Sequence, residues 1–112
     1  MSNYCENLKI KMDKYAHDFY RVTKKFPKNE IYGITSQIRR LTLSVVLNYV
    51  EGFARRNGDD CKVYNNFLKI SYGSLKESKY LLHFSLIEKY INQNNYKLLV
   101  ELSDEIGAML YK

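Results

Sequence analysis

The chain has 112 residues, of which 46% are hydrophobic and 27% charged, and its formal net charge is +6. This length predicts one domain, and the composition is typical of a globular protein rather than a disordered or membrane-spanning one. One proline and five glycines argue against an all-β chain. The first residues contain no basic stretch followed by an apolar core, so we expect no secretory signal and a cytoplasmic location.

The positive charge is confined to the first half of the chain. Residues 1–58 hold 11 basic and 5 acidic side chains, whereas residues 59–112 hold 7 of each. Segregated positive charge is typical of proteins that bind a polyanion such as nucleic acid. The alternative is a lysine-rich surface that only keeps the protein in solution.

The first predicted helix runs from Tyr4 to about Lys24. Its apolar residues recur at spacings of three and four, which places them on one face of a helix. They are Leu8, Met12, Tyr15, Phe19 and Val22. Phe26-Pro27 is expected to end this helix, because proline disfavours the helical conformation of the residue before it.

The second predicted helix, from about Thr35 to Arg56, is apolar in almost every direction. A turn at Gly33 and an N-cap at Thr35 are expected to begin it. Its polar residues share one stripe, about 80° wide. The stripe contains Gln37, Arg40, Ser44, Asn48, Glu51 and Arg55. A domain of this size cannot hide such a helix, so we expect a second subunit to cover it. Gly52 inside the helix predicts the close approach of another helix.

Two further helices are predicted in the second half. Residues 57–60 (NGDD) are expected to end the second helix and start the third, which extends to about Tyr90. Leucine and serine each repeat every seven residues in the third helix, which predicts a seam that a neighbouring helix approaches closely. Residues 92–95 (NQNN) are the third expected break. The sequence therefore predicts an all-α, up-down antiparallel four-helix bundle formed by residues 1–112.

Several motifs of the chain resemble those of one bacterial family. They are Phe26-Pro27, residues 32–40 (YGITSQIRR), residues 44–56 (SVVLNYVEGFARR) and residues 73–77 (GSLKE). In this order and spacing the chain resembles the four-helix-bundle family associated with intervening sequences in 23S ribosomal RNA genes. The accessory variability protein of diversity-generating retroelements is a more distant relative. Tyr49 and Val50 depart from the family pattern, which has Ile and Ala there.

The resemblance implies an architecture and a class of partners. The family's subunit assembles into a ring, typically a pentamer, and its molecular function is poorly established. The retroelement relative is basic, binds nucleic acid and contacts a reverse transcriptase. For this chain the resemblance thus implies a homo-oligomer, with RNA, DNA or a protein such as a reverse transcriptase as partner.

The first candidate site is a basic face for nucleic acid. Basic residues of the first helix share one face by their spacing, interrupted by Asp18, and the second helix adds two more. The candidates are Lys11, Lys14, Arg21, Lys25, Lys28, Arg39 and Arg56. Tyr15 and Tyr20 lie among them and are expected to stack on unpaired bases. The prediction is a sequence-tolerant surface that contacts phosphates.

The second candidate site is the polar stripe of the second helix, with two residues of the third helix that the family motif adds. Its members are Gln37, Arg40, Asn48, Glu51, Ser74 and Glu77. One interpretation is a functional seam or pore. The favoured one is a buried structural network, in which Arg40 pairs with Glu51 or Glu77 and Asn48 bonds to the backbone.

Motifs of known enzyme classes are missing from the sequence. It contains no nucleophile elbow, phosphate loop or zinc-protease motif. His17 and His83 are isolated, and Cys5 and Cys61 are expected to be reduced, so we expect neither a metal nor a cofactor. We predict a non-catalytic, oligomeric bundle that binds nucleic acid. The alternatives are a protein–protein adaptor scaffold and, least favoured, an enzyme that uses two glutamates as paired carboxylates.

Overall fold

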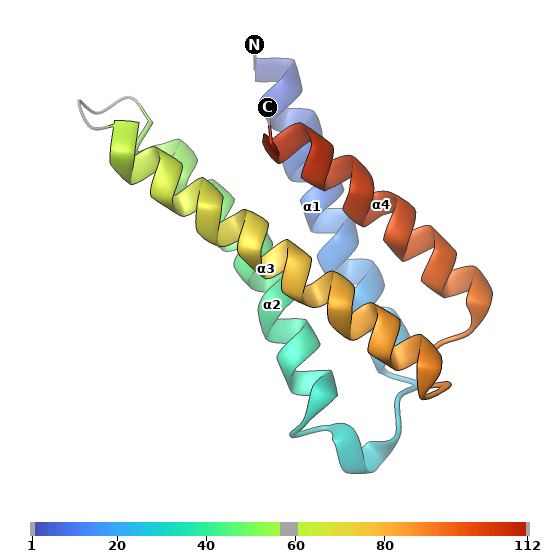
Figure 1. The fold of residues 1–112 in the computed structure, drawn as a ribbon. Coiled ribbons are helices and arrows are strands. Elements are labelled where there is room, and N and C mark those ends of the chain that lie inside the picture. Colours follow the sequence, from blue (N-terminus) through green and yellow to red (C-terminus); the bar gives the residue numbers. More distant parts are fainter. Residues whose placement is uncertain (1, 57–60, 112) are drawn as a thin grey trace.

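The computed structural model describes residues 2–56 and 61–111, apart from the side chains of Ser2 and Cys61. It contains α1 (Ser2–Thr23), the short 3-10 helix η1 (Lys28–Glu30), α2 (Ile34–Ala54), α3 (Cys61–Ile87) and α4 (Gln93–Tyr111) (Figure 1). The described residues include no β-strand. The prediction of an all-α fold with four helices is confirmed. None of these helices carries an apolar stretch of the length needed to cross a bilayer.

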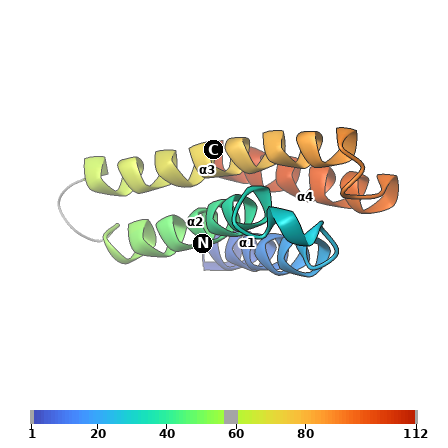
Figure 2. The same cartoon turned by 90° about the horizontal axis from the view of Figure 1, so that it is seen from below.

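The helices lie in two layers, with α1 and α2 in one and α3 and α4 in the other (Figure 2). Each helix packs against its neighbours in the chain, α2 against α3 most extensively, and α1 also packs against α4. The Tyr4 hydroxyl donates to the Met109 carbonyl at 2.8 Å, so the start of α1 lies beside the end of α4. The end of α2 and the start of α3 project away from α1 and α4 (Figure 1).

The core lies between the two layers and uses the apolar positions that the sequence indicates. It includes Leu8, Met12, Tyr15, Phe19, Ile38, Val45, Leu75, Leu82, Leu99 and Ile106, all at most 3% exposed. The serine seam of α3 faces inward, where Ser71 donates to the Val45 carbonyl at 2.7 Å. A Cβ built on Gly52 would lie 2.8 Å from the Cβ of Phe67, so the predicted close approach at Gly52 is confirmed.

The start of α2 differs from the prediction. This helix begins at Ile34 with Gly33 at the N-cap position, so Thr35 lies in the first turn and does not cap the helix. The Glu30 carboxylate accepts a long hydrogen bond of 3.4 Å from the Ile34 N–H instead. The capping group therefore comes from η1, four residues before the first helical residue.

The break before α4 also lies earlier than predicted. The Asn92 side chain accepts a hydrogen bond of 2.7 Å from the Asn95 N–H, so the asparagine-rich segment starts α4 rather than separating it from α3. The chain turns before that point, where Lys89 adopts a φ of 65°. The break predicted at residues 57–60 lies outside the described residues.

Candidate functional site

The polar stripe of α2 does not form the predicted buried ion-pair network. Arg40, Glu51 and Glu77 are all exposed, and no ion pair within the described part of the chain joins Arg40 to either carboxylate. Glu51 instead pairs with Arg55 one turn further along α2, at 2.6 Å. Charged side chains that remain in water need no partner, because solvent already stabilises their charge. The predicted pairing of Arg40 was therefore wrong.

A smaller polar contact joins α2 to α3. The Asn48 amide donates to the Ser44 carbonyl and hydroxyl, both at 2.9 Å, so the expected bond from Asn48 to the backbone is present. The Ser44 and Ser74 hydroxyls share a hydrogen bond of 2.8 Å across the two helices. Gln37 is exposed and takes no part. This contact therefore joins α2 to α3 through two small polar side chains.

The two glutamates weighed as a catalytic pair, Glu51 on α2 and Glu77 on α3, lie at different levels along the α2–α3 contact. Gly52, next to Glu51, faces Phe67, whereas Glu77 lies ten residues further along the same helix. Ten residues span about 15 Å of helix. Two carboxylates must approach far more closely to share a reaction, so the geometry does not support the enzyme hypothesis. Among the described residues, no three His, Cys, Asp or Glu side chains group closely enough to hold a metal ion.

The basic residues of α1 share one side of the helix, but carboxylates partly neutralise them. Lys14 and Arg21 both contact Asp18, Lys14 at 2.7 Å. Lys11 reaches Glu105 of α4 at 3.1 Å. Exposed ion pairs of this kind are weak, and a phosphate can compete for the same cations. Lys25 and Lys28 lie beyond α1, in the following turn and on η1, which corrects the prediction of one helical face.

A groove of about 590 Å³ lies between the second half of α1 and the start of α4. Its basic lining residues are Lys14, Arg21, Lys24 and Lys25, and its one lining carboxylate is Asp18. The α4 wall contributes Asn95, Leu98 and Leu99. Because basic side chains outnumber the carboxylate, the groove attracts anions.

A second groove, of about 430 Å³, lies between the end of α1, η1 and the first turns of α2. It is lined by Lys24, Lys28 and Arg39 and by no described carboxylate. Arg39 is held in place, because its Nε donates to the Thr23 hydroxyl at 2.8 Å and its guanidinium stacks 4.1 Å from the Tyr20 ring centroid. Lys24 borders both grooves, so they form one continuous basic surface.

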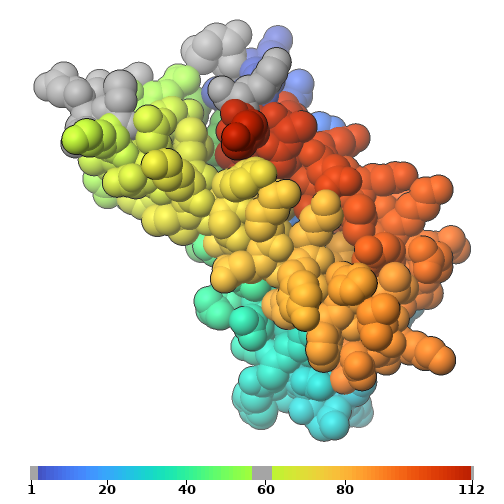
Figure 3. Space-filling model, in the orientation of Figure 1, coloured from blue at the N-terminus to red at the C-terminus, as the bar shows by residue number. Residues whose placement is uncertain are grey.

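We call this part of the molecule, residues 18–40, the basic end. It holds six basic and two acidic residues, and thus a net charge of +4 out of the chain's +6. The end of α1, η1 and the start of α2 meet there, at the bottom of Figure 1. In the space-filling view, η1 and the start of α2 protrude beyond α3 and α4 at the bottom of the molecule (Figure 3).

Of the two tyrosines expected to stack on bases, the structure excludes Tyr15. Tyr15 is fully buried, shares a 2.8 Å hydrogen bond with Ser78, and has its pKa raised by burial to about 12. Its predicted role was wrong. Tyr20 is 49% exposed, but Arg39 and Lys24 lie over its ring.

Arg56 does not belong to the basic end. It follows the last turn of α2, where its guanidinium stacks on the Phe53 ring at 4.0 Å from the centroid. Arg39, on α2, lies 17 residues before Arg56 in the chain. That interval corresponds to about 25 Å, so the two arginines cannot contact the same phosphate.

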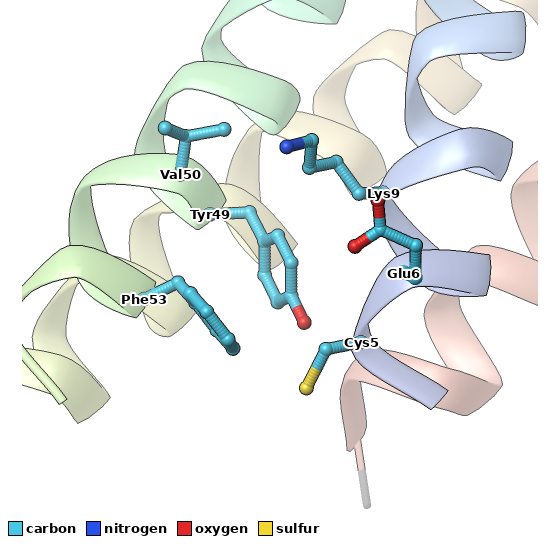
Figure 4. Close-up of a pocket in the computed structure, with 6 residues that line it drawn as sticks. All are labelled: Cys5, Glu6, Lys9, Tyr49, Val50 and Phe53. Atoms are coloured by element: carbon cyan, nitrogen blue, oxygen red, sulfur yellow. The ribbon is translucent and has the colours of Figure 1, made fainter. Parts of the chain in front are cut away.

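A small pocket of about 70 Å³ lies between the start of α1 and the last turns of α2 (Figure 4). Cys5, Glu6 and Lys9 line it from one side and Tyr49, Val50 and Phe53 from the other. The Tyr49 hydroxyl points toward Cys5, and burial raises the pKa of this phenol. The pocket volume is about half that of a cavity that holds benzene, roughly 150 Å³.

Comparisons with known proteins agree with the fold. A family model described as 23S rRNA-intervening sequence protein matches residues 7–112, which include the whole basic end. The crystal structure of a protein of unknown function from the S23 ribosomal protein family of Bacteroides thetaiotaomicron superposes with a TM-score of 0.79 and 25% sequence identity. The match covers 92% of this chain and 94% of that one. No curated protein matches this chain.

Proposed function

The chain belongs to the 23S rRNA-intervening sequence protein family, and we propose that it binds nucleic acid without catalysis, through phosphate contacts at the basic end. The observation that carries this proposal is the net charge of +4 on residues 18–40, arranged around two connected grooves. Basic side chains that neutralise phosphates release condensed counterions, which favours binding to any sequence. Binding of this kind weakens steeply as salt rises.

The proposal includes assembly of the subunit, as an up-down bundle, into a homo-oligomer. Leu43, Leu47 and Val50 recur at helical spacing on α2 and are 52%, 62% and 41% exposed. On α3, Ile70, Tyr80, Phe84 and Ile87 are also exposed. Apolar side chains in such number are typical of a protein–protein interface. The family resemblance favours a ring of five, in which repeated basic ends strengthen the attraction for a polyanion.

Fluorescence anisotropy of labelled structured RNA and duplex DNA across a salt series tests this function. We expect the logarithm of the binding constant to fall linearly with the logarithm of the salt concentration. The double variant Arg21→Gln/Lys25→Gln should reduce the slope on duplex DNA by about 0.9 for each phosphate that these side chains neutralise in the wild type. The matched control is Lys69→Gln/Lys76→Gln, which removes the same charge from the exposed side of α3.

Two results would contradict the proposal. Equal slopes for the two double variants would place the phosphate contacts away from the basic end. No binding to either nucleic acid at low salt would reject the function itself. The protein–protein adaptor would then remain, supported by the exposed apolar side chains of α2.

A further inference from the structure

One residue that lines the groove between α1, η1 and α2 carries a buried hydroxyl without a partner. Thr35 lines this groove and is 1% exposed. Its Oγ1 has no hydrogen-bond partner among the described residues. Leaving a buried polar group unsatisfied is costly, and most such groups in folded proteins are paired. A ligand that brings an acceptor oxygen into the groove would remove this cost.

The positive charges around this hydroxyl are not committed to carboxylates. No ion pair joins Lys24, Lys28 or Arg39 to a described acidic residue. The groove between α1 and α4 differs, because Asp18 already contacts two of its basic side chains. The α1–α2 groove therefore offers an anion three cations without the need to displace a carboxylate.

The first turn of α2 adds a further favourable field. The N-terminus of this 21-residue helix carries a partial positive charge and N–H groups without helical acceptors. Glu30 is the acidic residue beside this turn, and it is held by the Tyr90 hydroxyl at 2.9 Å and by the Ile34 N–H at 3.4 Å. It does not line the groove, so it caps one N–H and leaves the space beside Thr35 to an anion.

We propose that this groove is a fixed binding site for one phosphate group of a nucleic acid. The Thr35 hydroxyl donates to a phosphate oxygen, and Lys24, Lys28 and Arg39 neutralise the charge. The site rests on the proposed nucleic-acid function. It adds to that function one phosphate held in a defined position, whereas general charge attraction does not require any phosphate to be held in one place. An internal phosphodiester and a 5′-terminal phosphate share this chemistry, and the groove of about 430 Å³ has room for either with part of its sugar.

Thr35→Val tests the hydroxyl directly. Valine has nearly the same shape and removes only the unpaired polar atom, so the variant should be at least as thermally stable as the wild type. We expect oligonucleotide binding to weaken about tenfold, the effect of losing one hydrogen bond to a charged group. Thr42→Val is the matched control on the same helix, because the Thr42 hydroxyl is buried but already donates to the Arg39 carbonyl at 3.2 Å. The control should lose stability and keep its affinity.

Two probes separate failure of the site from failure of the function. Oligonucleotides of one sequence, with and without a 5′-phosphate, measure nucleic-acid binding, and a preference for the phosphorylated form identifies the terminal phosphate as the ligand. Inorganic phosphate, added against chloride at constant ionic strength, measures the site alone through the amide NMR signals of residues 33–37. We expect saturable shifts in the wild type that Thr35→Val abolishes.

Each outcome decides between the two proposals. Unchanged oligonucleotide affinity in Thr35→Val would overturn the site while leaving the function intact. If no oligonucleotide binds, the function fails, and the phosphate titration then judges the site by itself. Saturable shifts that depend on Thr35 would support an anion site, whereas their absence would overturn it.

Discussion

Gly52 offers a quantitative test of how closely α2 lies on α3. A Cβ at this position would lie 2.8 Å from the Cβ of Phe67 and 3.5 Å from the carbonyl oxygen of Tyr64. The Cβ of Phe67 is bonded directly to the α3 backbone, so no side-chain rotation relieves the clash and the helices must separate. Overpacking of this kind costs about 1–3 kcal/mol. The higher helix propensity of alanine offsets about 1 kcal/mol of this cost. Gly52→Ala should therefore lower the free energy of unfolding by about 0–2 kcal/mol.

Gly73→Ala is the matched control for this substitution. Gly73 lies inside α3, and an added Cβ there meets no atom within 4 Å. The free energy of unfolding of this variant should rise by about 1 kcal/mol, because alanine has the higher helix propensity and the added Cβ causes no clash. Thermal unfolding followed by circular dichroism, at one protein concentration, should therefore place the midpoint of Gly52→Ala at least about 4 °C below that of Gly73→Ala. Equal midpoints would refute the close approach of the two helices.

Three further predictions follow from buried, apolar and charged positions. Tyr15→Phe removes the hydrogen bond to Ser78 and should cost about 1 kcal/mol at neutral pH. Because burial raises the pKa of Tyr15 to about 12, the wild type should lose stability as the pH rises from the ordinary phenol pKa of 10 toward 12. Tyr15→Phe should lose less over that interval in urea titrations, and equal losses would contradict the assignment. Leu47→Glu places a charge on the exposed apolar strip of α2 and should yield monomers with unchanged helix content in analytical ultracentrifugation. An unchanged sedimentation coefficient would remove this strip from the interface. Asp18→Asn frees two basic side chains and should tighten low-salt binding to duplex DNA severalfold. Equal or weaker binding would show that these cations do not contact phosphate.

The helices themselves could be predicted because their signals are local. Apolar spacing in the first segment indicated the face that the structure buries, and Pro27 follows shortly after the observed end of α1 at Thr23. Gly52 indicated a close helix contact because glycine inside a helix is unfavourable unless the missing side chain serves packing. Such inferences depend only on residues within a few helical turns of one another.

The partners of charged and polar side chains could not be predicted, because they depend on distant elements. Helical spacing shows which residues of a stripe share a direction but not whether that direction faces water, which is why Arg40 was wrongly paired. Lys11 contacts Glu105, 94 positions away in the sequence. Thr35 was expected to cap α2, but Glu30 takes that role, and the Tyr90 hydroxyl from after α3 holds its carboxylate.

The proposed assembly strip and the proposed anion site lie at separate places along α2. Thr35 lies in its first turn, and the exposed apolar strip begins eight residues later at Leu43, about 12 Å further along. A partner subunit on the strip can therefore leave the groove open, and each added subunit contributes another basic end. A long nucleic acid would contact several of these ends at once and gain affinity through multivalency, whereas a short oligonucleotide would contact one. Leu47→Glu should accordingly weaken binding of long RNA far more than that of a short oligonucleotide, while Thr35→Val should weaken both. The same loss for both ligands in Leu47→Glu would mean that the strip and the groove are not separate.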